Sequence, residues 1–126
     1  MFRFSKRSIS NLERVHKQLA TLAEEVLKIS PFDFAITSGY RTLAQQQEMF
    51  AKKVSKCDGV RRISKHQEGK AIDIMVYDEE GKGTWEEKYY LQMAGVFKAV
   101  AKRLNIKIRC GVDFEKFFDG PHIELV

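Results

Sequence analysis

The sequence has few cysteines, few prolines and no long apolar run. Cys57 and Cys110 are its only 2 cysteines, and they form no CxxC metal-binding motif. We expect both thiols to be reduced, as is usual in a cytosolic protein. No apolar window approaches the length of roughly 18 residues that a transmembrane helix needs. Residues 1–13 contain basic side chains but lack the apolar stretch of a secretory signal, so none is expected.

Internal repeats, low-complexity tracts and linkers are also absent. Apolar residues make up 44% of the 126 residues, which is enough for one hydrophobic core. The length is typical of one domain, and we expect residues 1–126 to form a single domain.

Basic residues outnumber acidic residues, and the net charge is +5. This balance suits an anionic partner such as nucleic acid, a membrane surface or a polymer of a cell wall. No stripe of interleaved aromatic residues and arginines is present, which disfavours nucleic-acid binding. Charge alone does not choose among the other partners.

Hydrophobic spacing predicts three helices. Ser10 and Glu13 have the spacing of a capping box, and apolar residues then recur at helical spacing, so one helix is expected over residues 10–29. His16 lies on this helix, where a structural or surface role is expected. The second helix is predicted over residues 42–53. A second capping box at residues 84–87 opens the third helix, which runs to about residue 104.

The second predicted helix carries Met49 and Phe50, which we expect to face the core, and residues 54–64 are predicted to be a loop. Strands are predicted over residues 33–37, 71–77, 106–109 and 122–126. Helices and strands in this order fit an α+β domain better than a doubly wound sheet.

Two of the 3 histidines lie on or next to predicted strands, close to side chains that could bind a metal ion. His66 precedes a bend at Gly69, and Asp73 follows on the strand face opposite its apolar neighbours. His122 occupies the corresponding polar face of the last strand. If these strands are neighbours, His66, Asp73 and His122 could form a three-ligand zinc set with a fourth position for water.

Two carboxylates flank His122. A carboxylate beside a metal-activated water is the general base that metal-assisted hydrolysis requires, and Asp119 is assigned this role. Glu124 shares the strand face of His122, so we assign it to orient that ring, with a role as alternative base left open. Spacing alone also leaves a plain surface role open for each residue, because H-x6-D is a weak pattern.

Three segments carry a family resemblance. SKHQEGKAID, residues 64–73, resembles the S-x-H-x-x-G-x-A-x-D signature of zinc peptidases related to D-Ala-D-Ala carboxypeptidases and dipeptidases. TSGYRT, residues 37–42, is similar to the S-G-Y-R segment of that family, and DGPHIEL, residues 119–125, is similar to its closing acid-x-x-H element. All three stand in the family's order.

The resemblance is closest to the bacteriophage endolysin branch, the L-alanyl-D-glutamate peptidases. The segments FRFSKRSISNL, SPFDF and NIKIRCGVDF are similar to that branch, so the resemblance covers nearly the whole chain. It implies one zinc ion bound by His66, Asp73 and His122. It also implies that Asp119 is the catalytic acid and base, and that Arg41 holds a substrate carboxylate or the developing oxyanion. Further candidates for substrate binding are Ser38, Tyr40 and Ser64.

The implied fold is α+β, a small antiparallel sheet packed against helices, as in the zinc D-Ala-D-Ala peptidase (Hedgehog/DD-peptidase) fold. Residues 1–126 would be a single catalytic peptidase domain without a separate wall-binding domain. The segment between Asp113 and Asp119 is shorter than in some relatives, so ion-dependent regulation located in that insertion is not expected.

The implied function is hydrolysis of peptidoglycan stem peptides between L-Ala and D-Glu, leading to host lysis. D-Ala-D-Ala carboxypeptidase or dipeptidase activity, and a non-catalytic wall-binding module, are the alternatives. The expected partner is peptidoglycan, with no nucleic acid and no stable membrane association, and the protein is expected to be a monomer. It would stay in the host cytoplasm until a phage holin permeabilises the membrane.

Overall fold

Five antiparallel strands form one sheet in the computed structural model, which describes residues 2–126. The sheet has the order β1-β2-β5-β4, and β3 pairs with β2. The strands are β1 (Phe34–Ser38), β2 (Ala71–Tyr77), β3 (Gly83–Thr84), β4 (Ile108–Cys110) and β5 (His122–Leu125). The helices are α1 (Lys6–Leu12), α2 (Lys17–Ile29), α3 (Leu43–Ala51) and α4 (Glu87–Arg103), with a 3-10 turn at Gly111–Asp113.

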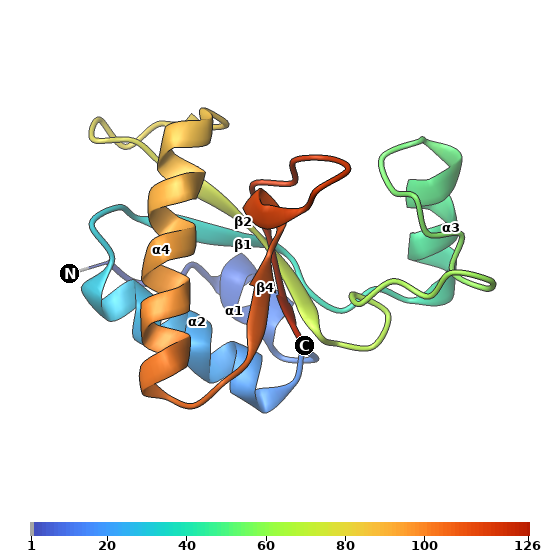
Figure 1. Ribbon diagram of the computed structural model, residues 1–126, viewed down its shortest axis with the longest axis horizontal. Helices are drawn as coiled ribbons and strands as arrows, with labels where there is room; N and C mark the ends of the chain where they lie inside the picture. The colour runs from blue at the N-terminus through green and yellow to red at the C-terminus, as the bar shows by residue number, and fades with distance from the viewer. Residues whose placement is uncertain (1) are drawn as a thin grey trace.

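The hydrophobic core lies between the sheet and the pair of helices α2 and α4, which contact each other (Figure 1). Alternate residues of β2 face this core, as expected from their apolar side chains. The fully buried side chains include Leu19, Leu22, Val26, Ile72, Ile74, Met93, Phe97 and Ile123. The α+β fold class predicted from the sequence is therefore confirmed.

The helix predicted over residues 10–29 is wrong in one respect, because it is two helices. Glu13 is the C-cap of α1, and its N–H donates to the carbonyl of Ser10, so these residues are not a capping box. The N–H of Gln18 donates to Nδ1 of His16, which makes His16 the N-cap of α2. The break turns α1 away from the axis of α2.

That turn lets α1 cover the edge of the sheet beside β1. The Ile36 N–H donates to Oγ of Ser8 at 3.0 Å, and Nδ2 of Asn11 donates to the Ile36 carbonyl at 2.7 Å. Side chains of a helix thus replace a missing neighbour strand, which removes an exposed edge that could pair with another chain.

Helix α3 stands apart from the core helices, at the right of Figure 1. Its capping box is formed by Thr42 and Gln45. Met49 and Phe50 do not face the core as expected: Met49 is half-buried and Phe50 is 46% exposed. The reason is that no core lies beneath α3, whose one buried residue is Gln46.

The helix predicted from the second capping box is present as α4, although the box is not. Thr84 belongs to β3, and its hydroxyl accepts the N–H of Glu86, which is the N-cap and makes no side-chain cap bond. Both cysteines are free. Within residues 2–126, none of the helices combines the length and apolar character needed to cross a membrane.

Candidate metal centre and its pocket

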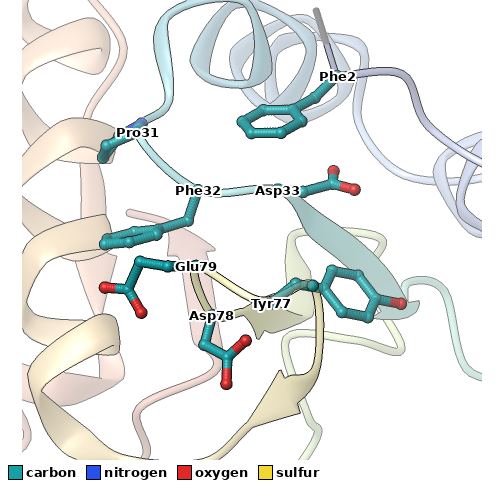
Figure 2. A pocket seen from close by; sticks show the side chains of 8 residues that line it. Phe2, Pro31, Phe32, Asp33, Tyr77, Asp78 and Glu79 are labelled. Atoms are coloured by element: carbon teal, nitrogen blue, oxygen red, sulfur yellow. The ribbon is translucent and has the colours of Figure 1, made fainter.

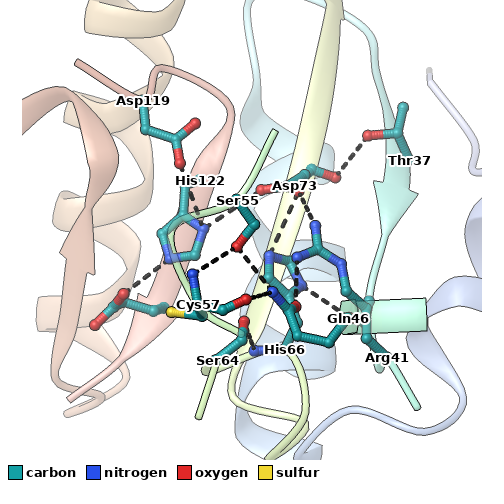
Figure 3. A network of polar contacts seen from close by, with 12 residues as sticks. Thr37, Arg41, Gln46, Ser55, Cys57, Ser64, His66, Asp73, Asp119 and His122 are labelled. Atoms are coloured by element: carbon teal, nitrogen blue, oxygen red, sulfur yellow. Dashed lines mark hydrogen bonds and ion pairs between the residues drawn. The ribbon is translucent and has the colours of Figure 1, made fainter. Parts of the chain in front are cut away.

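The pairing of β2 with β5 places Asp73 directly opposite His122. Both side chains lie on the sheet face away from the core, because Ile72 and Ile123 occupy the core face. His66 joins them from the turn that precedes β2. One ligand atom from each of His66, Asp73 and His122 lies within 4.8 Å of the other two, as the network in Figure 3 illustrates.

The bend at Gly69 positions the histidine turn against the break between α1 and α2. Gly69 has φ +70°, which is unfavourable for other residues, and an added Cβ would lie 3.0 Å from the Arg14 carbonyl. Its own carbonyl accepts the N–H of His16 at 2.7 Å. The broken helix and the glycine bend therefore hold each other, and together they fix the position of His66.

His66 is oriented by one hydrogen bond at the back of its ring. Its Nδ1 lies 2.8 Å from the carbonyl of Gly39, and because a carbonyl only accepts, Nδ1 carries the proton. Nε2 is therefore the ring nitrogen that faces the cluster, and it lies 3.4 Å from Oδ2 of Asp73. The side chain is 3% exposed, so the ring has little freedom to turn away.

His122 is oriented by Glu124 in the opposite sense. Its Nε2 lies 2.8 Å from Oε1 of Glu124, whereas Nδ1 lies 3.4 Å from Oδ1 of Asp73. A carboxylate that receives the N–H of a histidine fixes which nitrogen faces a metal. Burial opposes charge on Glu124, but the hydrogen bond with His122 and the positive charges of His122, Arg109 and Lys65 together outweigh it and lower the pKa of Glu124.

The spacing of these atoms is close to that of ligands around one metal ion. Zinc binds histidine nitrogen and carboxylate oxygen at about 2.0–2.1 Å, which places tetrahedral ligands about 3.4 Å apart. Nε2 of His66 lies 3.4 Å from Oδ2 of Asp73, and Nδ1 of His122 lies 3.4 Å from the other oxygen, Oδ1. Three donors of this kind leave a fourth position for water or substrate, as in catalytic sites.

The electrostatics of the metal-free cluster show how closely its groups interact. Burial alone would raise the pKa of Asp73, but hydrogen bonds with His122 and His66 outweigh it and hold that pKa well below its usual range. Burial also opposes a proton on His122, yet the bonds to Asp73 and Glu124 raise the pKa of His122 to about 9. A metal ion must therefore displace a proton from His122.

Asp119 lies beside this cluster, with Oδ2 3.9 Å from Nδ1 of His122. Its N–H donates to the carbonyl of Gly111, and its own carbonyl accepts the N–H of His122. A Cβ at Gly111 would collide with the Asp119 carbonyl, so this close approach requires glycine. Burial, with a smaller contribution from the charge of Asp73, raises the pKa of Asp119.

Both terminal nitrogens of the Arg41 guanidinium group make hydrogen bonds, one of them to the cluster. Nη2 lies 3.2 Å from Oδ2 of Asp73, Nη1 donates to Oε1 of Gln46 at 3.1 Å, and the backbone N–H donates to the carbonyl of His66. Burial lowers the pKa of Arg41, and Asp73 opposes that effect. The group remains a cation because its ordinary pKa is far above neutral.

Gln46 is a functional candidate that the sequence did not reveal. It is fully buried, and while Oε1 accepts from Arg41, Nε2 donates to Oγ of Ser55 and to the Cys57 carbonyl, each at 2.8 Å. The amide thus connects Arg41 to the loop before β2. Gln46 is the middle one of three consecutive glutamines, and nothing in the sequence singles it out for burial, which explains why it was missed.

These groups lie in a pocket of about 410 Å³ with two irregular walls. One wall is the segment from residue 53 to residue 65, and the other contains Phe114, Phe117 and Asp119. The Phe114 ring contacts that of His122 at 5.6 Å between centroids, and Nζ of Lys56 lies 4.5 Å from the Phe117 ring centre. The two walls therefore meet over the metal centre.

The three candidate substrate-binding residues occupy different places. Ser64 lines the pocket, and its hydroxyl accepts the N–H of His66. Ser38 pairs with Asp73 at the end of β1, and the Tyr40 ring lies 4.3 Å from the guanidinium carbon of Arg14. Neither Ser38 nor Tyr40 is among the residues that line the pocket.

A second cavity, of about 470 Å³, lies at the opposite end of β2 (Figure 2). Two of its three carboxylates have structural partners: Oδ1 of Asp78 accepts the N–H groups of Glu80 and Lys82, and Oε2 of Glu79 accepts the hydroxyl of Tyr89. These bonds close the turn between β2 and β3, so we assign a structural role to this end of the strand.

Two histidines and an aspartate beside a carboxylate and an arginine, at the base of a pocket, form the kind of site found in metal-dependent hydrolases. A family model described as phage L-alanyl-D-glutamate peptidase matches residues 1–126. The chain belongs to this family.

Individual relatives agree with the family match. The L-alanyl-D-glutamate peptidase of Escherichia phage T5 is 34% identical, over 99% of this chain and 98% of that protein. The peptidoglycan L-alanyl-D-glutamate endopeptidase CwlK of Bacillus subtilis (strain 168) is 24% identical, over 93% of this chain and 75% of that protein.

Solved structures share the fold. The L-Ala D-Glu endopeptidase ChiX of Serratia marcescens superposes with a TM-score of 0.87 and 29% identity, over 100% of this chain and 90% of that chain. The vancomycin resistance D,D-pentapeptidase VanY, solved in complex with Zn(II), has a TM-score of 0.59 and 17% identity. The match covers 89% of this chain and 72% of the VanY chain. At 17% identity, this similarity shows a shared fold alone.

Proposed function

We propose that this chain is a zinc-dependent endopeptidase that hydrolyses the L-Ala–D-Glu bond of peptidoglycan stem peptides, with residues 1–126 as one catalytic domain. The observation that carries the proposal is the convergence of His66, Asp73 and His122 beside Asp119, in a member of this family. Mixed nitrogen and oxygen donors that lie within 4.8 Å of one another support zinc as the ion.

In this proposal His66 binds through Nε2, His122 through Nδ1 and Asp73 through its carboxylate, while Glu124 keeps the His122 ring in place. When bound, the ion would polarise the scissile carbonyl and make water more acidic. Asp119 accepts the proton of the attacking water and later donates it to the leaving amine. Burial raises the pKa of Asp119, which makes its protonated form, the one that donates to the amine, easier to reach.

Arg41 supplies positive charge beside the reacting carbonyl. Its planar group is held by Asp73 and Gln46, so it is already oriented before substrate arrives. A fixed cation of this kind stabilises developing negative charge without reorganising in the transition state. It could equally hold a carboxylate of the substrate, since guanidinium and carboxylate pair through two parallel hydrogen bonds.

Digestion of purified peptidoglycan, with products identified by mass, tests the proposal. We expect cleavage between L-Ala and D-Glu that a chelator abolishes and zinc restores. Asp119→Asn should retain zinc, measured by elemental analysis, and lose about 10²- to 10⁴-fold in rate. Release of D-Ala instead would establish the D-Ala-D-Ala alternative, and wall binding without any product would establish a non-catalytic module.

We also propose that the protein acts from the host cytoplasm after a holin opens the membrane, and that it acts as a monomer. Membership of a phage peptidase family supports this proposal. Expression in an intact Gram-negative cell should be tolerated, and chloroform or a co-expressed holin should cause rapid loss of turbidity. Asp119→Ala is the control that should not lyse. Rapid lysis of cells with intact membranes would contradict the proposal.

A further inference from the structure

The pocket wall formed by residues 53–65 is cationic. The structure places four basic side chains along it, on the segment between α3 and β2: Lys53, Lys56, Arg62 and Lys65. Within residues 2–126, none of the four forms an ion pair with a carboxylate, whereas the neighbouring Lys52 pairs with Glu48 at 2.8 Å and lies outside the pocket. Together we call these four residues the cationic rim.

The carboxylates of the pocket do not neutralise this rim. Asp73 and Glu124 are engaged by histidines, and Asp119 lies against His122. Lys65 is near enough to Glu124 to contribute to the lowering of the pKa of that carboxyl, but the two form no ion pair. The mouth of the pocket therefore has a positive potential that favours an anionic ligand.

The bond cleaved in the proposed function has an anion next to it. D-Glutamate contributes its amine to the scissile bond and has two carboxyl groups. One of them continues the stem peptide, and the other remains as a free carboxylate close to the reacting carbonyl unless the cell wall is amidated. An enzyme with unpaired cations around its site can distinguish the two forms by charge.

We propose that the cationic rim binds the free carboxylate of the D-glutamate residue, so that the enzyme selects stem peptides in which this group is not amidated. The inference rests on the proposed function. Arg41 differs from the rim because Asp73 and Gln46 already hold its guanidinium. The rim contacts a part of the substrate that does not react, so its effect should fall mainly on KM, with kcat largely preserved.

The test uses two synthetic peptides that contain L-Ala-γ-D-Glu-L-Lys-D-Ala and differ only in the free carboxylate of D-Glu, which is an amide in the second peptide. The zinc-loaded wild type is compared with the double variant Lys56→Gln/Arg62→Gln. Lys52→Gln is the matched control, because it removes a neighbouring charge that does not line the pocket. Both values of kcat/KM are measured at low and high salt.

We expect the wild type and Lys52→Gln to prefer the acid over the amide by about tenfold, since exposed ion pairs each contribute a few-fold. The double variant should lose most of this preference through a higher KM for the acid, and salt should reduce it in the wild type. The preference is the ratio of kcat/KM for the acid to kcat/KM for the amide. Because both values come from the same enzyme sample, this ratio does not depend on the fraction of that sample that is folded.

Equal cleavage of the two peptides by the wild type would overturn the inference and leave the proposed function intact. A preference that survives in the double variant would also overturn it, because another group, such as Arg41, would then read the charge. Cleavage of neither peptide between L-Ala and D-Glu, by an enzyme with full zinc content, would overturn the proposed function itself.

Discussion

Gln46 gives the sharpest test of how the pocket is built, because one buried amide joins Arg41 to the loop before β2. In Gln46→Leu, Nη1 of Arg41 and the carbonyl of Cys57 lose their partner, whereas the hydroxyl of Ser55 loses one of two and still accepts the N–H of Cys57. A buried polar group left unsatisfied costs about 1–3 kcal/mol. Ser55 and Cys57 are half-buried and can recruit water, so most of the penalty falls on Arg41.

The protein can relieve that penalty without unfolding. Residues 52–70 contain no helix or strand, so the loop can open locally while the core stays intact. If Arg41 is then misplaced in the transition state, the activation free energy rises by about 1.4–2.8 kcal/mol. This increase corresponds to a loss of about 10- to 100-fold in kcat. We expect this loss with normal zinc content and a fall in Tm of only a few degrees.

Two measurements and two comparison variants separate loss of Arg41 positioning from general destabilisation. Steady-state kinetics give kcat and KM, and limited trypsin digestion reports loop opening, because Arg61 and Arg62 are exposed there. Gln46→Glu keeps an acceptor for Arg41 and should retain more of kcat than the leucine variant, although it also loosens the loop. Gln47→Leu, on the exposed face of α3, is the control. Normal kcat and unchanged digestion in Gln46→Leu would refute the reasoning.

Two further predictions concern the metal centre. His122 has its pKa raised from 6.5 to about 9 in the metal-free protein, so its bound proton stabilises the fold below about pH 6.5 and that contribution is lost as pH rises to 9. Thermal unfolding of the chelated protein should show stability falling over this pH range. Zinc affinity, measured by competition, should rise over the same range. If neither quantity changed with pH, the assignment of His122 would be contradicted. Glu124→Ala should weaken zinc binding by about 10- to 100-fold, as is usual for loss of a carboxylate behind a metal-bound histidine. Turnover lost at full zinc occupancy would instead make Glu124 the base.

The sequence could predict the strands, and with them the faces that carry Asp73 and His122, because alternation along a strand is local. It could not predict the break after Leu12. Val15 and Leu19 continue the helical spacing across the break, which depends on a contact with Gly69 more than fifty residues away, where the N–H of His16 binds the Gly69 carbonyl. Periodicity contains no information about such a contact.

Helix α3 shows a second limit of the same kind. Reading amphipathic spacing assumes that a core lies beneath the apolar face, and for α3 there is none, so Phe50 is exposed and the polar Gln46 is buried. The sequence therefore located the candidate metal ligands but missed Gln46, the group that organises the pocket wall. Propensity and pattern are weak where a segment is ordered by a functional site rather than by the core.

The division between sheet and loops has a consequence for how this site can vary. Asp73 and His122 lie opposite each other on the paired strands β2 and β5. Their neighbours Ile72 and Ile123 are buried in the core, so the packing that stabilises the fold also sets the distance between Asp73 and His122. The cationic rim and Phe117 belong to irregular segments that share few contacts with that core. Substitutions in residues 53–65 can therefore change which stem peptide is accepted while the spacing of the proposed metal ligands stays constant. In such an arrangement substrate choice can change without loss of the metal centre, because different parts of the chain determine the two properties.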